Sequence, residues 1–163
     1  MRYAPLFVLG LLVAASASAQ VSDSDAHNVT IDAPAVVSIA VGADVTINLA
    51  APTPGAPLEG TTTSTYAITT NMSSNKISAY ITGAAGYSNG VQLFSQLAAP
   101  GTGGTSTGEL ELLAGSGNAV DLVTGIPPTQ EGGLVINYRA TAPATTPDSY
   151  NETREVTYTI TGS

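Results

Sequence analysis

Glu109 and Glu111 are the pair of side chains best suited to acid–base catalysis, because they occupy alternate positions in a short apolar segment. Successive side chains of a strand point to opposite faces, so both carboxylates would lie on one face, about 6.5–7 Å apart. Paired carboxylates at about this separation serve as acid and base in glycoside hydrolases. Like charges on an exposed strand also discourage unwanted pairing at a sheet edge. We favour this second interpretation and keep the hydrolase as an alternative.

His27 is the single histidine of the chain and follows Asp25 by two positions. A histidine, a carboxylate and a serine can together form a hydrolase triad. His27 would, however, stand close to the start of the secreted chain, where a base is poorly held within hydrogen-bond reach of a nucleophile. We therefore expect a solvated histidine and assign no catalytic residue.

The segment Asp23-x-Asp25-x-x-Asn28 places oxygen atoms at intervals that resemble those of calcium loops. The glycine of the sharp turn and the bidentate glutamate of such loops are both missing. Asp23 and Asp25 are the candidate metal ligands, and they would need further ligands from another loop. The alternative is a solubilising lead segment. Because the chain has no cysteine, disulfides and thiolate metal sites are excluded, and we expect no cofactor.

Tyrosines supply most of the aromatic faces that could bind a sugar or another flat ligand, because the chain has no tryptophan and two phenylalanines. Tyr80, Tyr87 and Tyr150 fall on outward faces or in loops, and they are the candidate ligand-binding residues. A second group falls on the apolar faces of expected strands, where core packing is the interpretation we favour. This group contains Tyr66, Tyr138 and Tyr158.

The segments that would position these side chains alternate apolar and polar residues, which is the pattern of half-buried strands. The clearest two are residues 133–140 and 154–161, where Leu134, Ile136 and Tyr138, and then Val156, Tyr158 and Ile160, share a face. About ten short strands are expected in all, at residues 27–31, 36–41, 45–49, 65–70, 76–82, 91–97, 109–113, 118–124, 133–140 and 154–161.

Several short strands separated by Gly- and Pro-rich turns predict an all-β fold, and we expect an antiparallel β-sandwich of immunoglobulin-like, Greek-key type. Residues 50–63 contain three prolines, which lack an N–H for a ladder, so we interpret them as a surface crossover between the two layers. The strands at 65–70 and 76–82 are expected to form a hairpin around residues 71–75. Residues 101–108 are expected to be a flexible tip.

Residues 1–19 have the features of a secretory signal peptide: a basic start at Arg2, an apolar run over residues 6–15, and small residues before the expected cut after Ala19. The apolar run is shorter than the roughly 20 residues that span a bilayer. We predict a single domain over residues 20–163 and a secreted protein of the periplasm or cell surface. No membrane span is expected in the mature chain.

The charge balance bears on the partners of the secreted chain. Twelve acidic residues face four basic ones, and removal of Arg2 with the signal peptide lowers the formal charge from −8 to −9. Phosphate backbones and anionic lipids would repel such a chain, so nucleic acid is excluded as a partner. The absence of cysteine suits an exported bacterial or archaeal domain, which relies on its core for stability.

The function expected from these observations is that of a non-enzymatic structural or adhesive protein of the cell envelope, such as an appendage or matrix subunit. In its disulfide-free, Thr-, Gly- and Ala-rich composition the chain resembles small secreted bacterial surface proteins of immunoglobulin-like architecture, although it carries no motif that defines a family. The alternatives are a glycan- or ligand-binding module and a glycoside hydrolase. Expected partners are other envelope proteins or the chain itself, since residues 20–32 could add as a donor strand to another copy.

Overall fold

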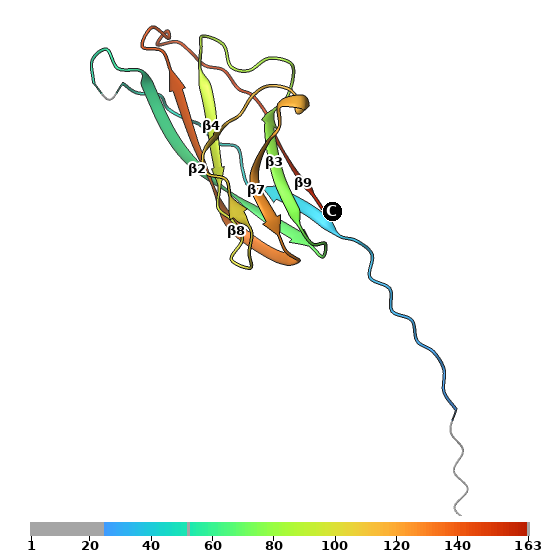
Figure 1. Ribbon diagram of the computed structural model, residues 1–163. Coiled ribbons are helices and arrows are strands. Elements are labelled where there is room, and N and C mark those ends of the chain that lie inside the picture. Colours follow the sequence, from blue (N-terminus) through green and yellow to red (C-terminus); the bar gives the residue numbers. More distant parts are fainter. Residues whose placement is uncertain (1–24, 52, 163) are drawn as a thin grey trace, which may run out of the picture. The chain divides into compact units, whose positions relative to one another are not determined.

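The computed structural model describes residues 25–51 and 53–162 (Figure 1). The chain divides into two compact units, Met1–Asp32 and Ala33–Ser163, which are considered separately. The predicted signal peptide and Asp23 lie outside the described residues. None of the helices in the described part of the chain is long and apolar enough to cross a membrane.

In the first unit, the described residues 25–32 form no strand, so the strand predicted at 27–31 is wrong. The side chains of Val29 and Ile31 are 72% and 90% exposed. Alternation creates an apolar face, but a strand also needs a neighbour that accepts its backbone hydrogen bonds, and these residues have none in the structure.

The second unit confirms the predicted antiparallel β-sandwich (Figure 1). One sheet has five strands, in the order β1 (Val37–Val41), β2 (Leu58–Thr70), β8 (Thr129–Ala142), β4 (Gln92–Leu97) and β6 (Leu110–Glu111). The other has four, in the order β5 (Thr105–Ser106), β7 (Val120–Ile126), β3 (Asn75–Ile81) and β9 (Val156–Thr161). A short 3₁₀ turn, η1 (Ser116–Asn118), precedes β7.

The core between the sheets consists of the alternate side chains that the sequence pattern places inward. Tyr66 and Ile68 of β2 are buried, and so are Ile77, Ala79 and Ile81 of β3. The inward face of β8 is buried along Leu134, Ile136, Tyr138, Ala140 and Ala142. The sandwich is therefore held together by burial of apolar surface from both sheets.

Every connection after β2 passes from one sheet to the other, so the hairpin predicted between residues 65–70 and 76–82 is wrong. The chain turns at Asn75, whose side chain is fully buried. Its amide donates to the carbonyl oxygens of Met72 at 2.7 Å and of Ile126 at 3.1 Å, and the Thr70 hydroxyl donates to its oxygen at 3.1 Å. These bonds fix a corner that carries the chain into the opposite layer.

The Pro-rich segment is not a crossover between layers, because β1 and β2 are neighbours in one sheet. The prolines end at Pro57, and β2 begins at the next residue. Gly60 lies within β2 beside Asn48, where a Cβ atom would stand 2.4 Å from the Asn48 carbonyl oxygen. The glycine therefore marks a close approach of two backbones rather than a break in the strand.

Residues 45–49 do not form the predicted strand, although Ile47 and Leu49 are half-buried against the core. The chain is bonded to β2 only before and after them, by Gly42 to Thr65 and by Ala50 to Glu59. From Gly42 to Ala50 the chain advances eight positions, whereas β2 covers six between Thr65 and Glu59. The two extra residues prevent a continuous ladder, so the segment bows away from β2. The unpredicted β5 lies in the expected flexible tip.

Candidate binding groove

A groove of about 1180 Å³ opens along the side of the sandwich where the sheets end in the bowed segment and in β9. One wall is the segment 41–49, and the other is the connection 146–155 with the start of β9. The lining includes core residues: Leu93, Tyr138 and Ala140 are buried, and Tyr87 and Tyr158 pack against them. We call this hollow the seam groove.

The seam groove is open because the bowed segment does not cover the space beside β9. Ile47 and Leu49 turn toward the core, but Val45, also in the lining, remains 40% exposed. Apolar surface from both sheets is thus left accessible at a place where a closed sandwich would bury it.

A chain of three hydroxyl groups connects the two sheets at the groove. The Tyr158 hydroxyl donates to that of Tyr138 at 2.8 Å and lies 3.2 Å from the hydroxyl of Ser95. Because the Tyr158 proton is used on Tyr138, Ser95 must be the donor to Tyr158. Burial raises the pKa of both phenols, so both stay protonated at neutral pH. The Tyr138 hydroxyl donates to no other group in the described part of the chain, so its proton can be donated to a ligand in the groove.

Glu152 ties together the two loops at the rim of the groove. Its Oε2 accepts hydrogen bonds from the backbone N–H and hydroxyl of Ser88, at 3.0 and 2.6 Å, and from the Tyr150 hydroxyl at 3.1 Å. Its other oxygen pairs with Arg154. The bonds from Ser88, followed by those from Tyr150 and Arg154, lower the pKa of Glu152 to about 2. Glu152 therefore stays charged and joins the loop that contains Ser88 to the connection that contains Tyr150 and Arg154; we call this contact the loop staple.

Residues 86–90 have the pattern Gly-x-Ser-x-Gly, a local signal for Ser88 that we overlooked when we assigned no catalytic residue. A nucleophile elbow needs that pattern on a sharp strand-to-helix turn with a histidine base nearby. Here Ser88 lies in the loop between β3 and β4, and its hydroxyl donates to a carboxylate that is already saturated with donors. The geometry makes Ser88 a partner of the staple.

The structure brings two of the three candidate ligand-binding tyrosines together. Tyr87 and Tyr150 both line the seam groove, whereas Tyr80 lies on β3 and is not part of its lining. Burial, followed by the hydrogen bond to Glu152, raises the pKa of Tyr150 to about 12. Burial also raises the pKa of Tyr87. Tyr138 and Tyr158, which the sequence pattern assigns to the core, belong to this site as well.

Glu109 and Glu111 lie on the outer side of the five-stranded sheet rather than in a hollow. Arg139 Nε donates to both carboxylate oxygens of Glu109 at 3.0 Å, and its guanidinium lies 4.2 Å from the centre of the Phe94 ring. The hydrogen bond from Arg139 lowers the pKa of Glu109, which favours the charged form over a proton-donating acid. Glu111 accepts a hydrogen bond from Gln92 at 3.0 Å.

Neither Glu109 nor Glu111 lines the seam groove or the smaller hollow described below. The pair therefore lies in neither of these two hollows, where a sugar could be held between its carboxylates.

His27 and Asp25 are both exposed, and Asp25 accepts a hydrogen bond from the Ala26 N–H at 2.9 Å. Among residues 25–51 and 53–162, no group of three or more acidic, histidine or cysteine side chains is placed to hold a metal ion. The other candidate ligand, Asp23, lies outside this range, so the pair is not brought together by what the structure describes.

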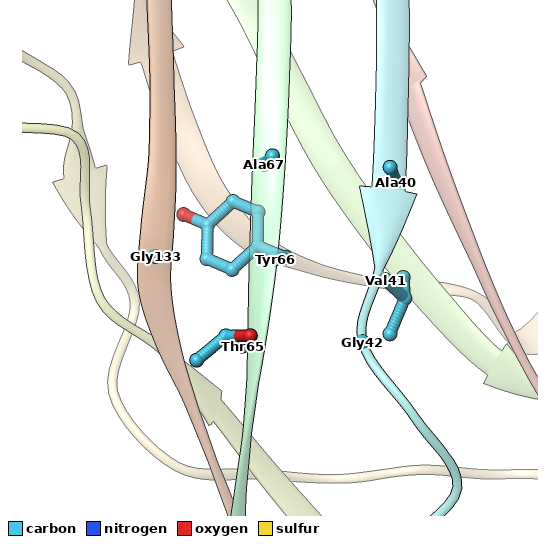
Figure 2. A pocket seen from close by; sticks show the side chains of 7 residues that line it. All are labelled: Ala40, Val41, Gly42, Thr65, Tyr66, Ala67 and Gly133. Carbon is cyan, nitrogen blue, oxygen red and sulfur yellow. The ribbon is translucent and has the colours of Figure 1, made fainter.

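A smaller hollow of about 230 Å³ lies between β1, β2 and β8 (Figure 2). The ring of Tyr66 extends from β2 toward Gly133, which has no side chain to cover it. Gly133 has a φ of +73° beside an irregularity in the β2–β8 register, so the hollow follows from a bulge. The Tyr66 hydroxyl donates to the carbonyl of Ala98, and the lining holds no acidic or basic side chain. We therefore take the seam groove as the candidate site.

Comparisons of the chain with protein-family models, with curated proteins and with solved structures found no match.

Proposed function

We propose that the chain is an exported, non-enzymatic structural protein of the cell envelope or surface, an appendage or matrix subunit that works by binding other copies of itself at the seam groove. The observation that carries this proposal is the groove itself. It exposes residues of both sheets that belong to the core or pack against it, among them Leu93 of β4 and Tyr158 of β9, at the edge of the sandwich. Apolar hollows with a polar rim mark binding sites.

The electrostatics of the groove support binding rather than catalysis. Glu152 has four donors around it and a pKa lowered to about 2. A general base works best with a pKa near the operating pH, and a saturated carboxylate is a poor proton acceptor. The phenols of Tyr138 and Tyr158 have pKa values raised by burial, so they act as hydrogen-bonding groups.

The test compares two valines of equal exposure. Val45 lines the seam groove and is 40% exposed, whereas Val36 is 41% exposed and is not part of the lining. We expect the chain from residue 20 onward to self-associate between about micromolar and millimolar concentration, measured by light scattering and sedimentation velocity. Val45→Asp should weaken association about tenfold or more, because it places a charge against an apolar contact.

Val36→Asp is the control and should leave association unchanged. A chain that stays monomeric over the whole range, or equal losses in the two variants, would refute the proposal. Far-UV circular dichroism and urea unfolding of both variants verify that the fold is retained.

A second candidate function is glycan or ligand binding, because Tyr87 and Tyr150 line one groove. The hydroxyl of Thr146, which is also in the lining, is buried without a hydrogen-bond partner in the described part of the chain. Aromatic faces beside hydrogen-bonding groups are what sugar rings need. A glycan array should show binding that Tyr150→Ala abolishes and Tyr80→Ala preserves. Signals at background, or equal losses in both variants, would exclude this function.

A further inference from the structure

The strand β9 has one edge without a strand partner among the described residues. It pairs with β3 on one side and is the last strand of its sheet. Thr82 donates to the carbonyl of Glu155 at 2.8 Å, so these two residues form a hydrogen-bonded pair across the β3–β9 ladder. In an antiparallel ladder such pairs alternate, so the amide and carbonyl groups of Val156 and Tyr158 point to the other edge. Within residues 25–51 and 53–162, no backbone hydrogen bond reaches these groups at that edge.

This free edge opens into the seam groove. Val156 and Tyr158 both belong to the lining, and so does the bowed segment that faces them from the other sheet. An added strand at this edge would bond to the free backbone groups and turn alternate side chains into the groove. The occupant must therefore be an extended segment with apolar residues two positions apart.

Residues 27–31 of the same sequence meet this description. Val29 and Ile31 stand two positions apart and are 72% and 90% exposed, while Asn28 and Thr30 would face the opposite side of a strand. The segment forms no strand in the structure. Burial of exposed apolar side chains of this size is favourable, so the two of them supply a driving force for docking.

We propose that residues 27–31 of one copy add as a strand to the free edge of β9 in a second copy, with Val29 and Ile31 turned into the seam groove. The inference rests on the proposed function and names the partner surface. The groove supplies apolar contacts through Leu93, Tyr138 and Tyr158, and β9 supplies the backbone hydrogen bonds. Because donor and acceptor lie on different parts of the chain, the contact repeats head to tail and builds a chain of subunits.

The experiment uses the full chain from residue 20 with Val29→Asp and Ile31→Asp combined, because these changes disable the donor and leave the groove intact. This variant should self-associate about tenfold or more weakly than the unchanged chain. Thr30→Asp is the matched control, since its side chain would face away from the groove, and it should associate as the unchanged chain does. Urea unfolding should be the same for all three proteins.

A second measurement isolates the acceptor. A fluorescent peptide of residues 25–33 is titrated into the donor-disabled chain, and binding is followed by anisotropy. We expect one peptide to bind per chain. The same peptide with Val29→Asp and Ile31→Asp should bind about tenfold or more weakly. In the chain, Val45→Asp should weaken binding of the peptide, and Val36→Asp should not.

The outcomes separate this inference from the proposed function. If the chain with Val29→Asp and Ile31→Asp associates as strongly as the unchanged chain while Val45→Asp still weakens association, residues 27–31 are not the donor strand. Self-association at the seam groove then remains supported. If the peptide binds but the unchanged chain remains monomeric, residues 27–31 occupy the groove of their own chain, and the pairing between two copies is refuted. Association that neither Val45→Asp nor the donor changes affect refutes both.

Discussion

Removing the hydroxyl of Tyr158 should destabilise the sandwich more than removing that of Tyr138, although the two hydroxyls share a hydrogen bond. Tyr158→Phe breaks both bonds of the Ser95–Tyr158–Tyr138 chain. Ser95 is fully buried and its hydroxyl has no other hydrogen bond in the described part of the chain, so this hydroxyl would be left without a partner. Such a group costs about 1–3 kcal/mol.

Tyr138→Phe removes only the terminal acceptor. Tyr158 keeps its bond from Ser95 and can donate to water in the groove, so the expected loss is one net hydrogen bond, about 0.5–1.5 kcal/mol. The double variant should be close to Tyr158→Phe alone, because the bond between the two phenols is already absent there. The coupling energy of the double-mutant cycle is therefore also about 0.5–1.5 kcal/mol.

The assay is urea unfolding at neutral pH, followed by far-UV circular dichroism because the chain has no tryptophan. Adding Ser95→Ala to Tyr158→Phe should restore part of the lost stability, since it deletes the orphaned hydroxyl. Fully additive losses for the two phenols, or no recovery with Ser95→Ala, would refute the assigned chain of donors.

Three further predictions concern the corner, the loop staple and the close backbone contact. Asn75→Ala should cost about 2–4 kcal/mol because it removes three hydrogen bonds from a fully buried amide, whereas Asn71→Ala, at an exposed site, should cost clearly less in the same urea assay. The pKa of Glu152 falls from 4.5 to about 2 on folding, so its stabilisation is complete above pH 4.5 and is lost as pH falls toward 2; Glu152→Gln should flatten this part of the stability–pH profile, and an unchanged slope would contradict the staple. Gly60→Ala should cost about 1–3 kcal/mol, since its Cβ would stand 2.4 Å from the Asn48 carbonyl oxygen. Gly86→Ala should be nearly neutral by thermal unfolding, since its Cβ would have no atom within 4 Å apart from its own residue and its two chain neighbours.

The core faces could be predicted from the sequence because alternation is a local property. Tyr66 and Ile68 on β2, and Ile77 on β3, are buried as their positions indicate. The pairing of these strands could not be predicted in the same way, since a hairpin and a sheet-to-sheet corner bury the same alternate residues. What selects the corner is the buried amide of Asn75, whose bond to the Ile126 carbonyl spans 51 positions in the chain.

The candidate site shows the same division between local and long-range information. The sequence indicates Tyr87 and Tyr150 as candidate ligand-binding residues because they fall on outward faces or in loops, and both line the groove. The alternation that assigns Tyr158 to the core cannot show that the groove reaches the core at this point. The staple between Ser88 and Glu152 joins residues 64 positions apart, so neither residue type nor local spacing indicates the contact.

The seam groove is open because two requirements on residues 43–49 conflict. Their alternating Val45, Ile47 and Leu49 favour packing on the core, yet the two extra positions between the bonds at Gly42 and Ala50 prevent a ladder with β2. An open strand edge beside exposed apolar surface is a liability that natural sandwiches ordinarily cover with charge, proline or a bulge. Here the edge of β9 at Val156 and Tyr158 stays accessible, and the same chain carries an exposed alternating segment of matching spacing. The open edge of β9 and the exposed alternating residues 27–31, both present in one sequence, are the two observations on which we base the proposed pairing between copies at the groove.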